Sequence, residues 1–204
     1  LTGNVRFEAG IALDEDNDDT AERDGAFRTD GKIQWNINGE NEAGLRYGAE
    51  IDMDDVATDK GVVINEAYVF VGGNWGQLRF GDKEGIINTL SAGGPGGFGS
   101  GGVDGSYGNY LVNGGASLSM NGVTSGDDTR ITYLSPDIGL GSGTTLNAGL
   151  SYAPSNNSGK KGGTASRVEG DEDSLFDIGA KIGGEAGSFS YNFSGAYAYA
   201  DNNP

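Results

Sequence analysis

The feature that most constrains this chain is an alternation of apolar and polar residues with a period of two. In the first segment the apolar positions are Val5, Phe7, Ala9, Ile11 and Leu13, and the polar positions include Asn4, Arg6 and Glu8. Successive side chains of a β-strand point to opposite faces, so the pattern predicts strands with one apolar and one polar face. It recurs along the chain and predicts about nine strands, in segments 5–13, 27–37, 45–53, 63–71, 77–81, 130–133, 146–152, 176–182 and 188–199.

The apolar content is low for a chain that must bury a conventional core. Hydrophobic residues make up 35% of the 204 residues, and the longest apolar run covers only residues 67–71. A transmembrane helix needs about 20 consecutive apolar residues. A transmembrane β-barrel needs only one apolar side per strand, because its interior and its loops are polar. The expected fold class is therefore all-β, an antiparallel transmembrane β-barrel.

The connections between the predicted strands alternate in length. Residues 38–41, 72–75 and 183–186 form short connections, whereas 14–24, 54–61, 82–128 and 154–173 are long and 135–143 is intermediate. Outer-membrane barrels have short periplasmic turns and long external loops. The pattern predicts a bacterial outer-membrane protein whose N-terminus lies on the periplasmic side. A soluble β-protein such as an adhesin, one alternative, has no reason to sort its loops in this way.

Aromatic residues follow the same division. One group lies near short turns and the other near long loops: Trp35, Trp75, Tyr133 and Phe189, and then Phe27, Phe80, Tyr152 and Tyr199. Two such groups are expected as the girdles at the two membrane interfaces. Because the aromatic residues sort to the outward face, the lumen is expected to have no aromatic track.

Charge and composition exclude several functions. The chain has 30 acidic and 13 basic residues, a net charge of -17, and neither Cys nor His. An acidic chain is a poor partner for nucleic acid, whose phosphates bind Lys and Arg. Without His or Cys, zinc sites and His-based catalytic triads are not expected. We therefore expect a protein that is not an enzyme.

Three stretches carry a family resemblance. The stretches 65–82 (NEAYVFVGGNWGQLRFGD) and 129–136 (TRITYLSP) resemble segments of Gram-negative general porins. The stretch 3–8 (GNVRFE) is similar to the first strand of alphaproteobacterial members. The three stretches follow one another along the chain as they do in that family. The resemblance covers nearly the whole chain and implies a trimeric barrel of about 16 strands whose third loop folds inward. One departure is Asp82, where many members carry a basic residue.

An odd number of strands would leave an unpaired edge in lipid. Residues 200–204 (ADNNP) look like the start of another external loop. The expectation is a single porin domain over residues 1–204 that forms the N-terminal part of a longer barrel.

The segment 82–128 occupies the place of the constriction loop in that family. It contains a glycine-rich stretch at residues 93–102, and so long a loop in a domain needs a reason. Folding into the lumen is one reason, and a disordered external loop is the alternative.

If the loop folds inward, opposed charges would form the constriction. The acidic candidates are Asp82, Glu84 and Asp104, with Asp127 and Asp128 as further candidates, and the basic candidates that face them are Arg6, Arg28, Lys32, Arg46, Arg79 and Arg130. Asp104, near the middle of the loop, is the first choice. The alternative for each basic residue is a solvated partner of a neighbouring wall acid.

An acidic run, residues 14–19, superficially resembles the start of a calcium loop. Its carboxylates are Asp14, Asp16 and Asp18 with their acidic neighbours, but the Gly and the distal Glu of an EF-hand are missing. A solvated external loop is one interpretation, and weak Ca²⁺ or Mg²⁺ bridging to lipopolysaccharide phosphates is the other. No further cofactor is expected.

The leading functional hypothesis is a water-filled channel for passive diffusion of small hydrophilic solutes and ions. The alternative is a substrate-selective channel for anions or sugars. Part of the outward face would contact partner subunits, with the small residues Gly25, Gly31 and Ala49 permitting close approach. On the predicted register Leu150 faces lipid and Ser151 faces lumen water, so Arg is expected to be costly at 150 and nearly neutral at 151.

Overall fold

The computed structural model describes residues 1–11, 25–54, 61–92, 127–155 and 172–202. It contains ten β-strands and one short helix, and the strands form one antiparallel sheet. The elements are β1 (Thr2–Ile11), β2 (Gly25–Glu40), β3 (Arg46–Asp54), β4 (Val63–Gly73), β5 (Gly76–Glu84), α1 (Ile86–Thr89), β6 (Asp127–Leu134), β7 (Ile138–Gly141), β8 (Thr144–Ser155), β9 (Glu172–Ala186) and β10 (Phe189–Asn202).

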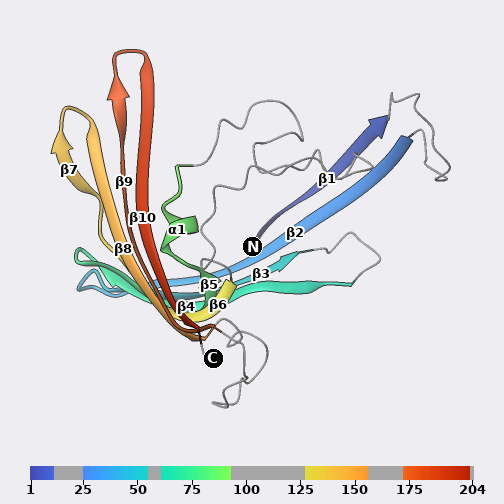
Figure 1. The fold of residues 1–204 in the computed structure, drawn as a ribbon, viewed down its shortest axis with the longest axis horizontal. Coiled ribbons are helices and arrows are strands. Elements are labelled where there is room, and N and C mark those ends of the chain that lie inside the picture. The colour runs from blue at the N-terminus through green and yellow to red at the C-terminus, as the bar shows by residue number, and fades with distance from the viewer. Residues whose placement is uncertain (12–24, 55–60, 93–126, 156–171, 203–204) are drawn as a thin grey trace.

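Each strand pairs with its neighbour in the chain, apart from one detour. The order is β1-β2-β3-β4-β5-β6-β8-β9-β10, and β7 pairs only with β8. The sheet curves so that β1 and β2 form one side and β8–β10 the other, with α1 in the concavity between them (Figure 1). We call the concave face the inner face and the convex face the outer face. Among the residues described, no helix is long and apolar enough to cross a membrane.

The strand β7 was missed by the sequence prediction, which gave about nine strands. It lies within the connection 135–143 and pairs with the start of β8 through Ile138 and Leu146. The reversal is made at Ser142 and Gly143, whose φ angles are 51° and 75°. Two consecutive residues with positive φ are typical of the tight turns that join antiparallel strands. The apolar run here is too short for a period-two pattern to stand out.

The short connections all lie at one end of the sheet. They join β2 to β3, β4 to β5, β7 to β8 and β9 to β10. The opposite end of the sheet is where β3, β5 and β8 end and where β4, β6 and β9 begin. In the first short turn the Asn41 side chain accepts hydrogen bonds from the backbone N–H groups of Ala43 and Leu45, at 3.0 and 2.9 Å. The sorting of connections by length, expected from the sequence, is therefore present in the described part of the chain.

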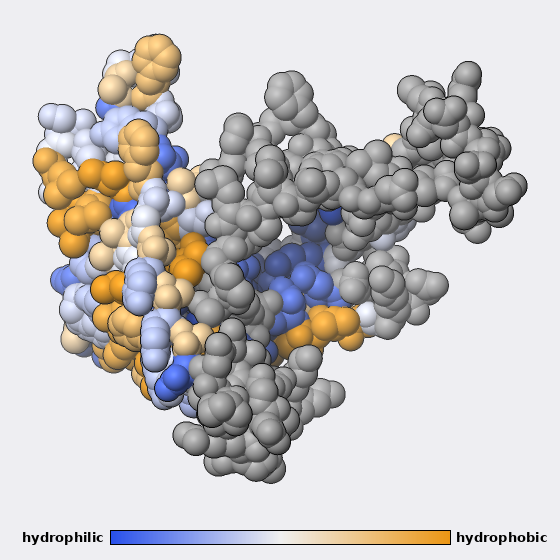
Figure 2. Space-filling model, in the orientation of Figure 1, coloured by the Kyte–Doolittle hydropathy of each residue, from blue (hydrophilic) through white to orange (hydrophobic). Residues whose placement is uncertain are grey.

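The two faces of the sheet differ in chemistry as the alternation predicted. Large apolar side chains on the outer face remain exposed, among them Phe7, Trp35, Ile37, Val69, Leu150, Ile178 and Phe193. Figure 2 shows apolar residues on the flank formed by β7–β10 and hydrophilic residues in the hollow of the sheet. Among the described residues, the buried apolar side chains are only Ile86, Leu90, Ala153 and Leu175. A sheet with so small a core and so much exposed apolar surface is not expected to be stable in water alone.

An aromatic pair lies at the end of β5 and β6 that carries the short turns. The rings of Trp75 and Tyr133 stack at 6.5 Å with an interplanar angle of 8°, and the Tyr133 hydroxyl donates to the Trp75 carbonyl oxygen at 2.7 Å. Amphipathic rings of this kind are enriched where apolar surface meets water. Their position agrees with the girdle predicted near the short turns.

Candidate functional site

The inner face of β2–β5 carries ion pairs between neighbouring strands. Lys32 on β2 forms an ion pair with Asp52 on β3 and lies 3.7 Å from Asp54. Lys83 on β5 donates to Glu66 on β4 at 2.5 Å. Asp52 and Glu66 face each other in the register of β3 and β4. The result is a row of charges across four strands, with two carboxylates in the middle and one ammonium at each end.

Two aromatic side chains lie on the same face. Tyr68 and Phe70 follow Glu66 in alternation, and their ring centroids are 6.5 Å apart. The Arg79 guanidinium carbon lies 5.5 Å from the Tyr68 centroid, and the Lys83 ammonium nitrogen lies 5.6 Å from it. The expectation that aromatic residues sort outward is therefore wrong for these two. Tyr68 and Phe70 lie two and four positions after Glu66, so the period of two along the strand already places all three side chains on the same face.

Glycine makes room for one of these rings. A Cβ at Gly48 would lie 2.8 Å from Cε1 of Phe70, so the ring can lie on β3 only because position 48 has no side chain. Arg79 is also held by its neighbour, because its Nε donates to Gln77 Oε1 at 2.7 Å. We call Lys32, Asp52, Glu66, Tyr68, Arg79 and Lys83 the early wall.

A second charged cluster on the inner face spans β6, β8 and β9. Arg130 donates to Asp128 Oδ2 at 3.1 Å and to Ser151 Oγ at 3.1 Å, and its Nη1 lies 3.8 Å from Asp177 Oδ2. The Ser151 hydroxyl in turn donates to Asp177. We call Asp128, Arg130, Ser151 and Asp177 the late wall. The Arg130 side chain is only 1% exposed, so this guanidinium is part of a buried network.

The burial of the late wall changes one expectation. Ser151 lies on the inner face as predicted, but it is fully buried. An arginine at position 151 would place a second guanidinium beside Arg130, at a position where the serine side chain is fully buried. The premise that Ser151 faces lumen water is therefore wrong, and the substitution is expected to be costly because it would bury a second charge.

The other predicted site residues lie in different surroundings. Arg6 on β1 and Arg46 on β3 are exposed, and Arg46 Nη2 donates to the Gly73 carbonyl oxygen at 3.4 Å. Asp82 and Glu84, near the end of β5, are partly buried. Outside the residues whose side chains the structure describes lie Asp104, Asp14, Asp16, Asp18, Arg28 and Asp127. For them the predictions of a constriction and of weak cation binding stay predictions.

The start of the predicted constriction segment lies on the inner face. After β5 the chain forms the turn α1, which contacts β5, β8, β9 and β10. Ala92 then donates its backbone N–H to Ser194 Oγ on β10 at 3.0 Å. Residues 85–92, which we call the root segment, therefore cross the inner face from β5 to β10, and residues 93–126 lie outside the described part.

The arrangement suits the conduction of polar solutes better than a reaction. The early wall presents both signs of charge at defined positions, with Lys32 42% exposed. Opposed charges on a water-filled wall orient dipolar solutes and disfavour apolar ones. Within the described ranges no cluster of three acidic side chains is placed to hold a metal ion.

Comparison with known proteins agrees with this architecture. A family model described as Gram-negative porin matches residues 1–204. A loop-deletion mutant of OmpT, an outer membrane protein of Vibrio cholerae, has a similar structure with a TM-score of 0.50 and 13% identity, over 98% of this chain and 70% of that chain. No curated protein sequence matches the chain.

Two further solved structures are similar at a lower score. A mutant of the porin from Rhodobacter blastica has a TM-score of 0.49 and 15% identity, over 96% of this chain and 63% of that chain. The trimer form of in-vitro folded OmpT from Vibrio cholerae has a TM-score of 0.49 and 13% identity, over 99% and 67%. This chain thus spans about two thirds of the length of these proteins.

Proposed function

This chain belongs to the Gram-negative porin family, and from that premise we propose that its inner face lines a water-filled passage for small hydrophilic solutes and ions. Porins are channels of the bacterial outer membrane, so the chain is an outer-membrane channel protein and not an enzyme. The supporting observation is the early wall, where paired charges of both signs lie on the polar face of the curved sheet.

We further propose that the segment 82–128 narrows this passage, because its described part already crosses the inner face. The root segment ends at the hydrogen bond from Ala92 to Ser194. Asp104 would face the basic wall residues Arg6, Lys32, Arg46 and Arg79 across the gap. At a narrow point few water layers separate such charges, so screening by salt is weaker than outside.

Reversal potentials in planar bilayers test the proposal. Arg46→Gln removes an exposed inner-face cation and should shift ion selectivity towards cations, whereas Asp104→Asn should shift it towards anions. Glu42→Gln is the matched control, because Glu42 is exposed in the short turn between β2 and β3. If the Arg46→Gln and Asp104→Asn variants insert normally and keep the wild-type reversal potential, the charges at positions 46 and 104 do not act on the permeating ions.

A specific observation supports a substrate-selective channel as the second candidate. Tyr68 and Phe70 present aromatic rings on the inner face beside the cations Arg79 and Lys83. The cations attract organic anions and the rings offer apolar contact to a sugar, so these side chains support a channel that is selective for such solutes. Liposome swelling separates the candidates: Tyr68→Ala should change the uptake of a sugar acid but not that of a neutral amino acid of similar size. Equal changes for both solutes would favour the unselective channel.

We also propose a homotrimer embedded in outer-membrane lipid and lipopolysaccharide. The outer face of β1–β4 carries exposed apolar side chains, among them Val5, Phe7, Trp35, Ile37 and Val69. Part of this surface would contact neighbouring subunits, and small residues such as Gly31 and Ala49 would allow close approach. Chemical crosslinking of detergent-extracted protein should yield dimers and trimers, and a monomer alone would contradict the proposal.

A further inference from the structure

The root segment follows a short path that local hydrogen bonds define. After the extended residue Gly85, the turn is held by bonds from Thr89 N to the Gly85 carbonyl oxygen at 3.0 Å and from Leu90 N to that of Ile86 at 2.9 Å. The Thr89 hydroxyl adds a bond to the Glu84 carbonyl oxygen at 3.4 Å. These bonds hold the segment in a single turn where it lies on the sheet.

The side chain of Ile86 connects this unit to the inner face. Ile86 is fully buried. A Cβ at Gly149 on β8 would lie 2.5 Å from its Cδ1, and a Cβ at Gly179 on β9 would lie 2.9 Å from its Cγ2. Gly149 and Gly179 are partners in the register of β8 and β9. The two glycines together therefore form one depression that the Ile86 side chain fills.

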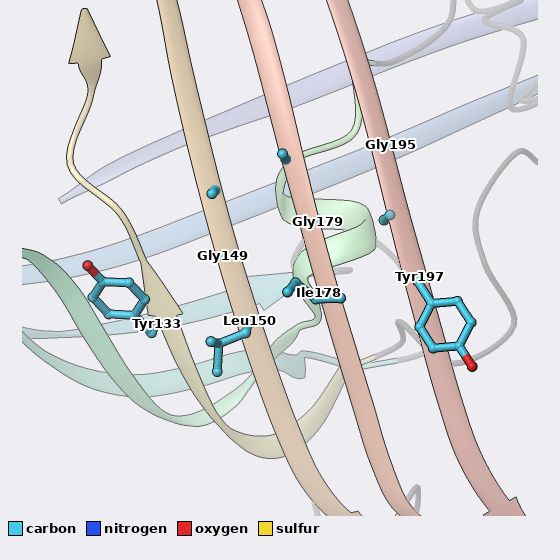
Figure 3. A pocket seen from close by; sticks show the side chains of 10 residues that line it. Tyr133, Gly149, Leu150, Ile178, Gly179, Gly195 and Tyr197 are labelled. Atoms are coloured by element: carbon cyan, nitrogen blue, oxygen red, sulfur yellow. The ribbon is translucent and has the colours of Figure 1, made fainter.

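At this point the sheet carries small residues on both of its faces. Figure 3 shows Gly149 and Gly179 on neighbouring strands with the α1 turn behind them. On the outer face the same region is hollowed by a cavity of about 490 Å³, whose lining includes the small residues Ala148, Ala180 and Gly195. Only glycine at positions 149 and 179 lets the turn come this close to the backbone of the strands.

We propose that Ile86 is a positioning residue, which holds the root segment in the depression formed by Gly149 and Gly179. Its contact there sets how far the root segment extends from the inner face of β8 and β9 into the passage. The hydrogen bond from Ala92 to Ser194 fastens the other end. The effect on conduction rests on the proposed channel function, whereas the seating itself can be tested without it.

An engineered disulfide tests the seating. The chain has no cysteine, so the pair Ile86→Cys and Gly179→Cys would introduce its only thiols. Cβ atoms joined by a disulfide lie about 3.5–4.5 Å apart, and Ile86 Cγ2 is one bond from its Cβ and 2.9 Å from the Cβ position of residue 179. Oxidation should crosslink the folded protein and change its migration on a non-reducing gel.

The pair Ile86→Cys and Gly195→Cys is the control. Gly195 has open space around it, so this pair should not crosslink. A folded barrel without the 86–179 crosslink would overturn the seating.

Single-channel conductance tests the consequence. Gly179→Ala places a methyl group against Ile86, so the root segment must lift from the wall and the conductance should fall. The matched control Gly195→Ala adds the same group in open space and should leave conductance unchanged. In an Ile86→Ala background the effect of Gly179→Ala should disappear, whereas an unrelated defect of β9 would persist. An efficient crosslink together with unchanged conductance in Gly179→Ala would uphold the seating and show that the root segment does not narrow the passage, which overturns the positioning role.

Discussion

The early and late walls both pair acidic with basic side chains on the inner face of the sheet, yet the surroundings of these side chains differ. In the early wall two buried acids pair with bases that are more exposed: Asp52 is 1% exposed and its partner Lys32 is 42% exposed, and Glu66 is 6% exposed and its partner Lys83 is 17% exposed. In the late wall the base is buried as well, since Arg130 is 1% and Asp177 is 2% exposed. Of the two walls, the early wall is the one whose charges a passing solute can meet.

The difference teaches that position on the inner face and a role in conduction are separate properties. Removing one partner of a buried charge network leaves an uncompensated charge, and the cost is large. A charge in contact with water costs little to remove and can act on ions in the passage. We therefore expect late-wall substitutions to affect stability first and early-wall substitutions to affect selectivity first.

The largest effect is expected in the late wall. Arg130→Met would leave Asp128 and Asp177 without the guanidinium that now joins them, and should destabilise the folded protein by about 3–5 kcal/mol. Urea-induced unfolding of the protein in lipid vesicles would measure it. Arg46→Met is the matched control, because Arg46 is exposed on the same face and its loss should change the midpoint little. Similar midpoints for the two variants would show that burial does not separate the walls.

A smaller effect tests the assignment of inner and outer faces on which the comparison depends. Leu150→Arg places a charge on the outer face, which meets lipid, and should cost about 2–4 kcal/mol. Asn147→Arg on the inner face of the same strand would face Lys181, its register partner, but can bind Asp137, which Asn147 now contacts at 2.6 Å; it should therefore cost less than the charge in lipid. The same unfolding experiment applies. A larger loss for the position 147 variant would mean that the faces of β8 are reversed.

An intermediate case lies within the early wall. The Lys83 side chain is 17% exposed and binds Glu66, which is 6% exposed, so Lys83→Gln should cost about 1–3 kcal/mol. It should also shift the reversal potential towards cations. Lys181→Gln is the matched control on β9, because it removes the same charge from a partly buried inner-face position outside both walls. Loss of stability without a change in selectivity would assign Lys83 to a structural role like that of Arg130.

The smallest effect on stability is expected at Arg79. Its contact with the Tyr68 ring should contribute about 0.5–1 kcal/mol at a partly exposed site. Arg79→Gln removes that contact and one positive charge, and we expect a shift of the reversal potential towards cations larger than that caused by Arg130→Gln. The opposite ranking, measured in the same salt gradient, would reverse the roles assigned to the two walls.

Much of the fold could be predicted because the alternation of side chains along a strand is a local property of the backbone. It correctly placed Arg6, Lys32 and Glu66 on one face and Phe7, Trp35 and Leu150 on the other. The lengths of the connections, also readable from the chain, predicted which end of the sheet carries the short turns. β7 escaped this reasoning because four residues are too few to show a period.

The sequence by itself determined the strands other than β7, the polar and apolar faces of these strands apart from Tyr68 and Phe70, and the family to which the chain belongs. Only the tertiary structure decided which inner-face charges are buried, that Lys32 pairs with Asp52 on the next strand, and that Ile86 lies on Gly149 and Gly179. The physical reason is the separation along the chain. The alternation arises between adjacent residues, whereas burial depends on which distant segment comes to lie opposite, as residue 86 does for residues 149 and 179 on two paired strands.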